Sequence, residues 1–170
     1  MNDNTINLYK WIDKTITQSI SKTKDNIQIV IFYDFASDYF DHTDNKIRIG
    51  IMNISDDKIQ KLINRMKKLK LPTQFDIVNL RLTLKYIKNI DQLEIIFKFI
   101  NELLLSGGYV VGLINNDDKL LENIKNLIKN TSLYIKYIYD IRKYASKFIE
   151  KHEIDKNDVP NDNILIITRK

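Results

Sequence analysis

Apolar runs of strand length alternate with amphipathic helical patterns along the chain, and this alternation is the feature that most constrains the fold. Four runs rich in β-branched residues are predicted to be strands: 27–32, 47–52, 75–84 and 109–114. Three segments with apolar residues at helical spacing are predicted to be helices: 55–71, 91–105 and 117–129. Because parallel strands need crossover connections, the pattern predicts an α/β fold with an open, doubly wound, mostly parallel sheet.

The two ends of the chain extend this pattern. A helix at about residues 5–20 is expected to pack on the sheet, and residues 1–170 are expected to form a single domain. Near the C-terminus, 141–152 is predicted to be a helix and 163–168 a strand. The run 134–139 fits either an extra strand or the start of the last helix. Two caps are predicted, a left-handed C-cap at Gly107 and an N-cap at Asn116.

Composition limits the compartment and the partners. The chain has no cysteine, no basic-then-apolar leader pattern and no apolar run near the ~20 residues that span a bilayer. We therefore expect a soluble protein of a reducing intracellular compartment, the cytoplasm by default, with the nucleus also open. The formal charge of +5 permits an acidic partner such as RNA, although many lysines lie near acids in the sequence.

In an open parallel sheet, a ligand binds beyond the carboxyl ends of the strands, where the strand order reverses. A nucleotide-type ligand needs glycines in the first loop for close backbone approach, and an acid after the second strand for the ribose. This chain instead has Asp34, Ala36 and Asp38 in the first loop and Asn53 after the second strand. These side chains would crowd a ligand, and the two carboxylates would repel an anionic one.

Several segments together resemble the class I S-adenosylmethionine-dependent methyltransferases, and most closely the mRNA cap guanine methyltransferases. NLYKWIDKTI is similar to the family's N-terminal helix, and IQIVIFYDFASDYF lies where a VLDLGCGKGGDL-type stretch belongs. RIGIMNISDDKIQKLINRMKKL resembles a YIGIDIS segment with its helix, and FDIVNLRLTLKYI resembles FDVVSCQFALHY. LLLSGGYVVGLINNDDKLLENI is the most specific match, to LKPGGYFIGTIPDSDKLL. The resemblance covers most of the chain and implies a Rossmann-like methyltransferase fold.

The same resemblance implies that the cofactor site is degenerate. The family's cofactor-contacting lysine falls on Asp13, its first-loop glycines fall on Asp34, Ala36 and Asp38, and its ribose-binding acid falls on Met52 or Asn53. A glutamine becomes Arg81, the cap-contacting histidine becomes Lys85, and Tyr86 keeps the aromatic ring. Only residues 70–74 occupy the place of the family's third strand, so the sheet is expected to lack one edge strand.

From this resemblance we expect degenerate cofactor positions at Asp34, Ala36, Asp38, Asn53 and Arg81, and substrate positions at Lys85 and Tyr86. No catalytic residue, bound cofactor or metal is expected. The predicted function is a catalytically silent subunit that binds a catalytic methyltransferase or capping enzyme subunit, with RNA as a further possible partner. A minimal active cap methyltransferase using S-adenosylmethionine is one alternative.

A cofactor-free RNA-binding module is the other alternative. It would use the basic helix after Ser55, Lys85, Lys88 and the tyrosines near residue 134. Tyr134, Tyr137 and Tyr139 fit either base stacking or a packed sheet edge. The basic residues of the helix fit either a solvated face or a phosphate-binding ridge.

Overall fold

The computed structural model describes residues 2–22, 27–33, 47–50, 56–87 and 89–170. Within them a sheet of six strands has the order β2-β1-β3-β4-β6-β5. The strands are β1 (Ile29–Tyr33), β2 (Ile47–Gly50), β3 (Phe75–Arg81), β4 (Leu104–Asn115), β5 (Leu133–Asp140) and β6 (Asp162–Arg169). Strands β1 to β4 pair in parallel, whereas β6 is antiparallel to both β4 and β5. The predicted open, mostly parallel sheet is confirmed.

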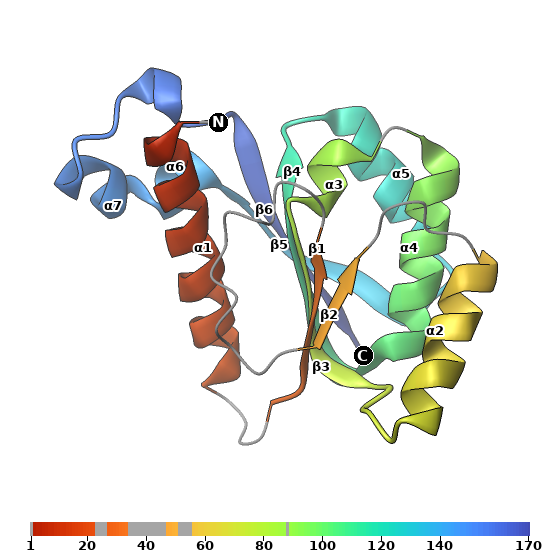
Figure 1. Ribbon diagram of the computed structural model, residues 1–170. Helices are drawn as coiled ribbons and strands as arrows, with labels where there is room; N and C mark the ends of the chain where they lie inside the picture. The colour runs from red at the N-terminus through yellow and green to blue at the C-terminus, as the bar shows by residue number, and fades with distance from the viewer. Residues whose placement is uncertain (1, 23–26, 34–46, 51–55, 88) are drawn as a thin grey trace.

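Helices cover both faces of this sheet (Figure 1). One face carries α2 (Asp56–Lys68), α4 (Ile90–Leu103) and α5 (Asp118–Ile128), whose apolar stripes form the larger core with β3 and β4. The other carries α1 (Asp3–Ser21), α6 (Ile141–Tyr144) and α7 (Ser146–Lys151). A short helix, α3 (Thr83–Tyr86), follows β3, and a 3-10 turn, η2 (Lys156–Asp158), precedes β6. The fold is therefore doubly wound, and α1 packs on the sheet as predicted.

Several predicted boundaries were wrong. The strand predicted at 75–84 ends at Arg81, which has φ 46°, and the apolar run continues into α3 because Leu82 and Leu84 are also buried. The helix predicted at 141–152 is divided at Ala145 into α6 and α7. The C-cap of α4 is Leu104, and Gly107 lies inside β4. The N-cap of α5 is Asp117, whose carboxylate accepts from two backbone N–H groups, and not Asn116.

The ambiguous run at 134–139 belongs to a strand, β5, which pairs only with β6. At the opposite side of the sheet, residues 69–74 between α2 and β3 contain no strand, so β2 is the edge strand of the described sheet. Of the helices in the described part of the chain, none has both the length and the apolar character that a bilayer crossing requires.

Candidate functional site

The strand order reverses between β1 and β3, because the chain continues from β1 outward to β2 and then returns to β3. A ligand crevice in such a sheet lies beyond the carboxyl ends of these two strands. Arg81 is the last residue of β3 and therefore borders this crevice. The predicted positions Asp34, Ala36, Asp38 and Asn53 lie outside the described residues.

Arg81 is buried at the crevice and forms an ion pair with α1. Its Nε lies 3.6 Å from Oδ2 of Asp13, and its side chain is only 3% exposed. Asn79 contacts both residues: its Nδ2 donates to Oδ1 of Asp13 over 2.6 Å, and its Oδ1 accepts from the Arg81 N–H over 3.0 Å. The hydrogen bond from the Arg81 N–H holds Arg81 in the left-handed backbone region, which residues other than glycine rarely adopt. The charges of Asp13 and Arg81 thus compensate each other.

Little space remains beside this ion pair. The cavity between α1 and the sheet that is lined by Asp13, Asn79 and Arg81 has a volume of about 10 Å³. That is about the smallest volume that holds one water molecule. On the side of the crevice nearest α1, the protein's own side chains therefore fill the space between the helix and the sheet.

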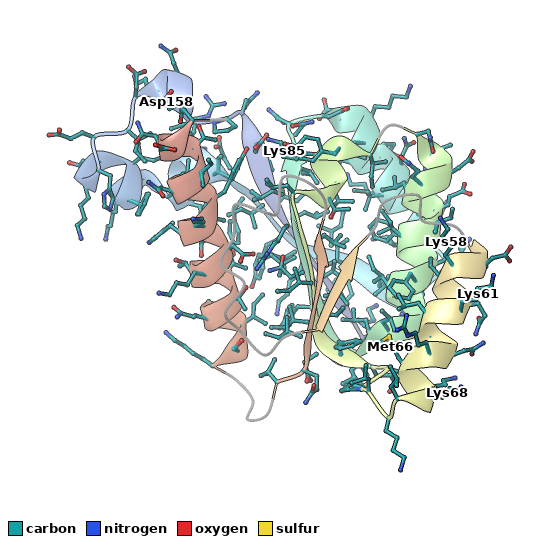
Figure 2. The ribbon with its side chains drawn as sticks, in the orientation of Figure 1. Lys58, Lys61, Met66, Lys68, Lys85 and Asp158 are labelled. Atoms are coloured by element: carbon teal, nitrogen blue, oxygen red, sulfur yellow. The ribbon has the colours of Figure 1, made fainter. Side chains whose placement is uncertain are left out.

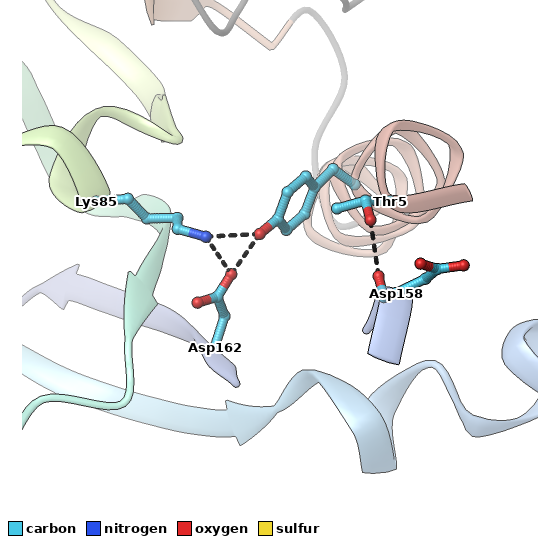
Figure 3. A network of polar contacts seen from close by, with 5 residues as sticks. Thr5, Lys85, Asp158 and Asp162 are labelled. Atoms are coloured by element: carbon cyan, nitrogen blue, oxygen red, sulfur yellow. Dashed lines mark hydrogen bonds and ion pairs between the residues drawn. The ribbon is translucent and has the colours of Figure 1, made fainter. Parts of the chain in front are cut away.

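Lys85 forms a second contact between the crevice and α1. Helix α3 places its Nζ 2.6 Å from Oδ2 of Asp162, at the start of β6, and 2.6 Å from the hydroxyl of Tyr9. The Tyr9 hydroxyl donates to the same carboxylate oxygen over 2.5 Å, which closes a triangle of contacts (Figure 3). Beside it, the Thr5 hydroxyl donates to the Asp158 carbonyl over 2.7 Å. These contacts fix the N-terminal half of α1 to the start of β6 and to the 3-10 turn before it.

The predicted substrate positions therefore have different environments. Lys85 is mostly buried and takes part in this triangle, whereas Tyr86 is 49% exposed. The partners Tyr9, Asn79 and Asp162 were not predicted as site residues. Among the partners of Arg81 and Lys85, only Asp13 had a sequence signal, because the resembling family has a lysine at that position.

The phenol of Tyr9 gives a test of the triangle through pH. Burial first, and then the hydrogen bond to Asp162, raise its pKa well above the usual value. The folded state therefore keeps this proton to a higher pH than the unfolded chain, in which the pKa of tyrosine is about 10. The stabilisation is complete below about pH 10 and is lost as the pH rises further, by up to about 1.4 kcal/mol per pH unit.

We therefore expect the free energy of unfolding of the wild type to fall more steeply above about pH 10 than that of Tyr9→Phe. Urea unfolding followed by circular dichroism between about pH 8 and pH 11 measures both curves. Because Lys85 and every other titratable side chain are present in both proteins, their difference isolates Tyr9. Parallel curves would contradict the buried, protonated phenol.

Solved structures of methyltransferases have this fold. A S-adenosylmethionine-dependent methyltransferase from Clostridium acetobutylicum matches with a TM-score of 0.55 and 14% identity, over 94% of this chain and 91% of that one. Another from Mesorhizobium loti matches with a TM-score of 0.50 and 12% identity, over 95% and 98% of the two chains. Geranyl diphosphate C-methyltransferase from Streptomyces coelicolor matches with 0.50 and 9%, over 94% and 80%.

No protein-family model matches the sequence, and no curated protein is significantly similar to it. At identities this low, the structural matches establish the fold and not the activity. The chain therefore has the Rossmann-like fold of class I S-adenosylmethionine-dependent methyltransferases, and among the described residues β2 is the edge strand on that side of the sheet. The resemblance drawn from the sequence is confirmed at this level.

Proposed function

We propose that this protein is a catalytically inactive methyltransferase-like domain that serves as a structural or regulatory subunit of an RNA-modifying methyltransferase, in the first place an mRNA capping enzyme. The observation that carries the proposal is the buried ion pair of Asp13 and Arg81 at the edge of the crevice. A methyltransferase accelerates transfer chiefly by positioning the methyl donor and the acceptor. In this protein, the side chains of Asp13 and Arg81 at the crevice instead hold α1 against the sheet.

Two features of the crevice support this reading. The resemblance puts a cofactor-contacting lysine at position 13, where this chain has an aspartate bound by Asn79 and paired with Arg81. It also puts a substrate-contacting side chain at position 85, where Lys85 is held by Tyr9 and Asp162.

The proposed partner is the catalytic methyltransferase subunit, and the proposed contact surface is the side of the molecule formed by β2 and α2. An edge strand leaves backbone groups available for pairing, so edges are normally covered. Leu69 and Leu71, just after α2, are 58% and 43% exposed. Lys58, Lys61 and Lys68 lie along α2, from which the buried Met66 points toward the sheet (Figure 2). This combination suits an apolar contact surrounded by acidic residues of a partner.

Titration of the purified chain with S-adenosylmethionine and S-adenosylhomocysteine tests the inactive state. We expect no heat of binding, and no shift in melting temperature. A ligand at about 100 times its dissociation constant would stabilise the fold by about 2.7 kcal/mol, which a thermal scan detects. An active methyltransferase of the same fold is the positive control.

Clear binding would reject the inactive reading and favour the minimal active enzyme, supported by the fold alone. A methyl-transfer assay on capped RNA would then be the next step.

Co-expression with candidate catalytic subunits tests the regulatory role. We expect a stable complex and a changed methyl-transfer rate of the partner. A Leu69→Glu, Leu71→Glu variant should lose the complex while keeping the fold, because both side chains are exposed. The matched control is Tyr86→Glu, which changes an exposed aromatic residue of α3, away from the proposed contact surface, and should keep the complex. If the chain stays monomeric with every candidate and alters no partner's rate, the subunit role is wrong.

A further inference from the structure

A second concave site lies under the C-terminal half of α1, on the face of the sheet that β4, β5 and β6 form. Its cavity has a volume of about 210 Å³ and is lined by Ile16, Ser19, Ile20, Tyr109, Lys136, Tyr137, Tyr139, Tyr144 and Ile166. From Tyr9 to Ser19 the helix rises about 15 Å, so this site is well separated from the triangle at Lys85. It is a different site from the cofactor crevice.

A β-bulge gathers the aromatic side chains at this site. Ile135 pairs with Ile167 and Tyr137 pairs with Ile166, so Lys136 is the extra residue of β5. Without the bulge, the alternation of a strand would place Ile135, Tyr137 and Tyr139 on one face. With it, Ile135 packs into the core on the α5 side, while Tyr139 packs into the core on the α1 side. Tyr137 then joins Tyr139 and Tyr109 around the cavity.

The aromatic rings form a stack that ends at the surface. The ring centroids of Tyr137 and Tyr139 are 5.3 Å apart at 17°, and those of Tyr139 and Tyr144 are 5.6 Å apart. Tyr137 is 45% exposed, and Tyr134, earlier on the same strand, is 40% exposed. Tyr134 and Tyr137 pair with Thr168 and Ile166, which are two residues apart on β6, or about 7 Å along a strand. Two exposed rings are thus presented along one edge strand.

Two lysines accompany these rings. Nζ of Lys136 donates to the Tyr109 hydroxyl over 3.0 Å and lies 5.1 Å and 5.6 Å from the ring centroids of Tyr109 and Tyr137. Nζ of Lys170 lies 5.6 Å from the ring centroid of Tyr134. Within the described residues neither ammonium group has a carboxylate partner, so both positive charges are available to an anion. A purely apolar protein partner would bury these charges without compensation.

We propose that this surface binds single-stranded nucleic acid, with bases stacked on Tyr137 and Tyr134 and phosphates next to Lys136 and Lys170. Aromatic side chains beside cations are how proteins hold unpaired bases and their backbone. A duplex keeps its bases stacked inside and offers none to the tyrosines. The inference goes beyond the proposed subunit role and does not depend on it, because neither a cofactor nor a partner protein takes part.

Fluorescence anisotropy with labelled 12-nucleotide RNA, DNA of the same sequence and the matching duplex tests the site. We expect Tyr137→Ala to weaken single-strand binding about ten-fold, because stacking on one ring contributes about 1–3 kcal/mol per base. Tyr137→Phe keeps the ring and should stay within about two-fold of the wild type. Lys136→Met should lower the slope of log affinity against log salt by about 0.7. Lys125→Met, at an exposed position of α5, is the matched control and should leave the slope unchanged.

Circular dichroism and urea unfolding establish that each variant is folded, and Tyr134→Ala replaces Tyr137→Ala if the latter is not. Equal affinity for RNA and DNA supports binding through base stacking and phosphate contacts. A higher affinity for one of them identifies the type of single strand that the site prefers. Equal affinity for the duplex, no single-strand binding, or a loss caused by Lys125→Met and not by Tyr137→Ala would overturn the proposal. So would a protein partner whose binding needs Tyr137 when RNA binding does not.

Discussion

Replacing Asp162 by alanine is expected to lower the free energy of unfolding by about 3 kcal/mol. The carboxylate is only 3% exposed, and it accepts from the Tyr9 hydroxyl and from Nζ of Lys85. Its removal leaves a buried hydroxyl without its acceptor and an ammonium group without its counter-charge. Breaking a buried ion pair by deleting one partner costs about 3–5 kcal/mol. The lower end applies because Lys85 is 14% exposed and reaches water.

Urea unfolding measures this loss, and a thermal scan should show a melting temperature lower by roughly 6–12 °C for a chain of this length. Asp162→Asn is the graded variant: it keeps an acceptor for Tyr9 but loses the charge, so its loss should be smaller than that of alanine. Asp158→Ala is the matched control, because that side chain also binds α1, through Asn2 and Asn4, but its hydrogen bonds are exposed. Its cost should be about 1 kcal/mol or less. Equal losses at the two aspartates would contradict a buried network at Asp162.

The order of these losses bears on function. If Asp162 and Lys85 chiefly stabilise the docking of α1, then a side chain placed where the family contacts its substrate has become part of the scaffold. A crevice whose charged groups stabilise the fold is consistent with the proposed role as a subunit that acts through its surfaces.

The fold could be predicted from the sequence because its helices and strands have local signals. The apolar stripe predicted for this helix was Ile59, Leu62, Ile63, Met66 and Leu69. Ile59, Ile63 and Met66 are buried as helical spacing requires, whereas Leu69 lies just beyond the end of α2 and is 58% exposed. The end of β3 had no such signal, because the buried residues Leu82 and Leu84 extend the apolar run into α3. The strand β5 was ambiguous because its pairing with β6 and its bulge depend on residues far away in the sequence.

The contacts at the crevice could be predicted only in part. The resemblance indicated Arg81 and Lys85, and Arg81 is the last residue of β3, at the crevice. It could not indicate their partners, since Asn79 meets Asp13 across 66 residues and Lys85 meets Tyr9 and Asp162 across 76 and 77. No spacing rule within one helix or strand reaches that far.

The second large effect is expected at the double glycine, which was the most specific part of the resemblance. Strand pairing shifts there: Phe75 pairs with Leu104, but Ile77 pairs with Tyr109, so β4 accommodates extra residues opposite β3. A Cβ at Gly108 would lie 2.8 Å from the Leu105 carbonyl oxygen and 2.9 Å from the Asp76 carbonyl oxygen. The Leu105 oxygen belongs to β4 itself and the Asp76 oxygen to the neighbouring β3, so the backbone of β4 would have to shift and the two strands would have to separate. Gly108→Ala should therefore cost about 3 kcal/mol.

Gly107→Ala is the neighbouring control. Gly107 has φ +74°, and a Cβ there would meet nothing within 4 Å, so only the left-handed backbone opposes the change, at about 1–2 kcal/mol. Urea unfolding of both variants should rank Gly108→Ala as clearly the less stable. That ranking would mean that close approach of β4 to β3 requires the second glycine. The double glycine would then be explained by the fold that this chain has in common with methyltransferases, and it would not be evidence for methyl transfer. If the two variants are equally stable, the bulge tolerates a side chain at Gly108 and its presence needs a different explanation.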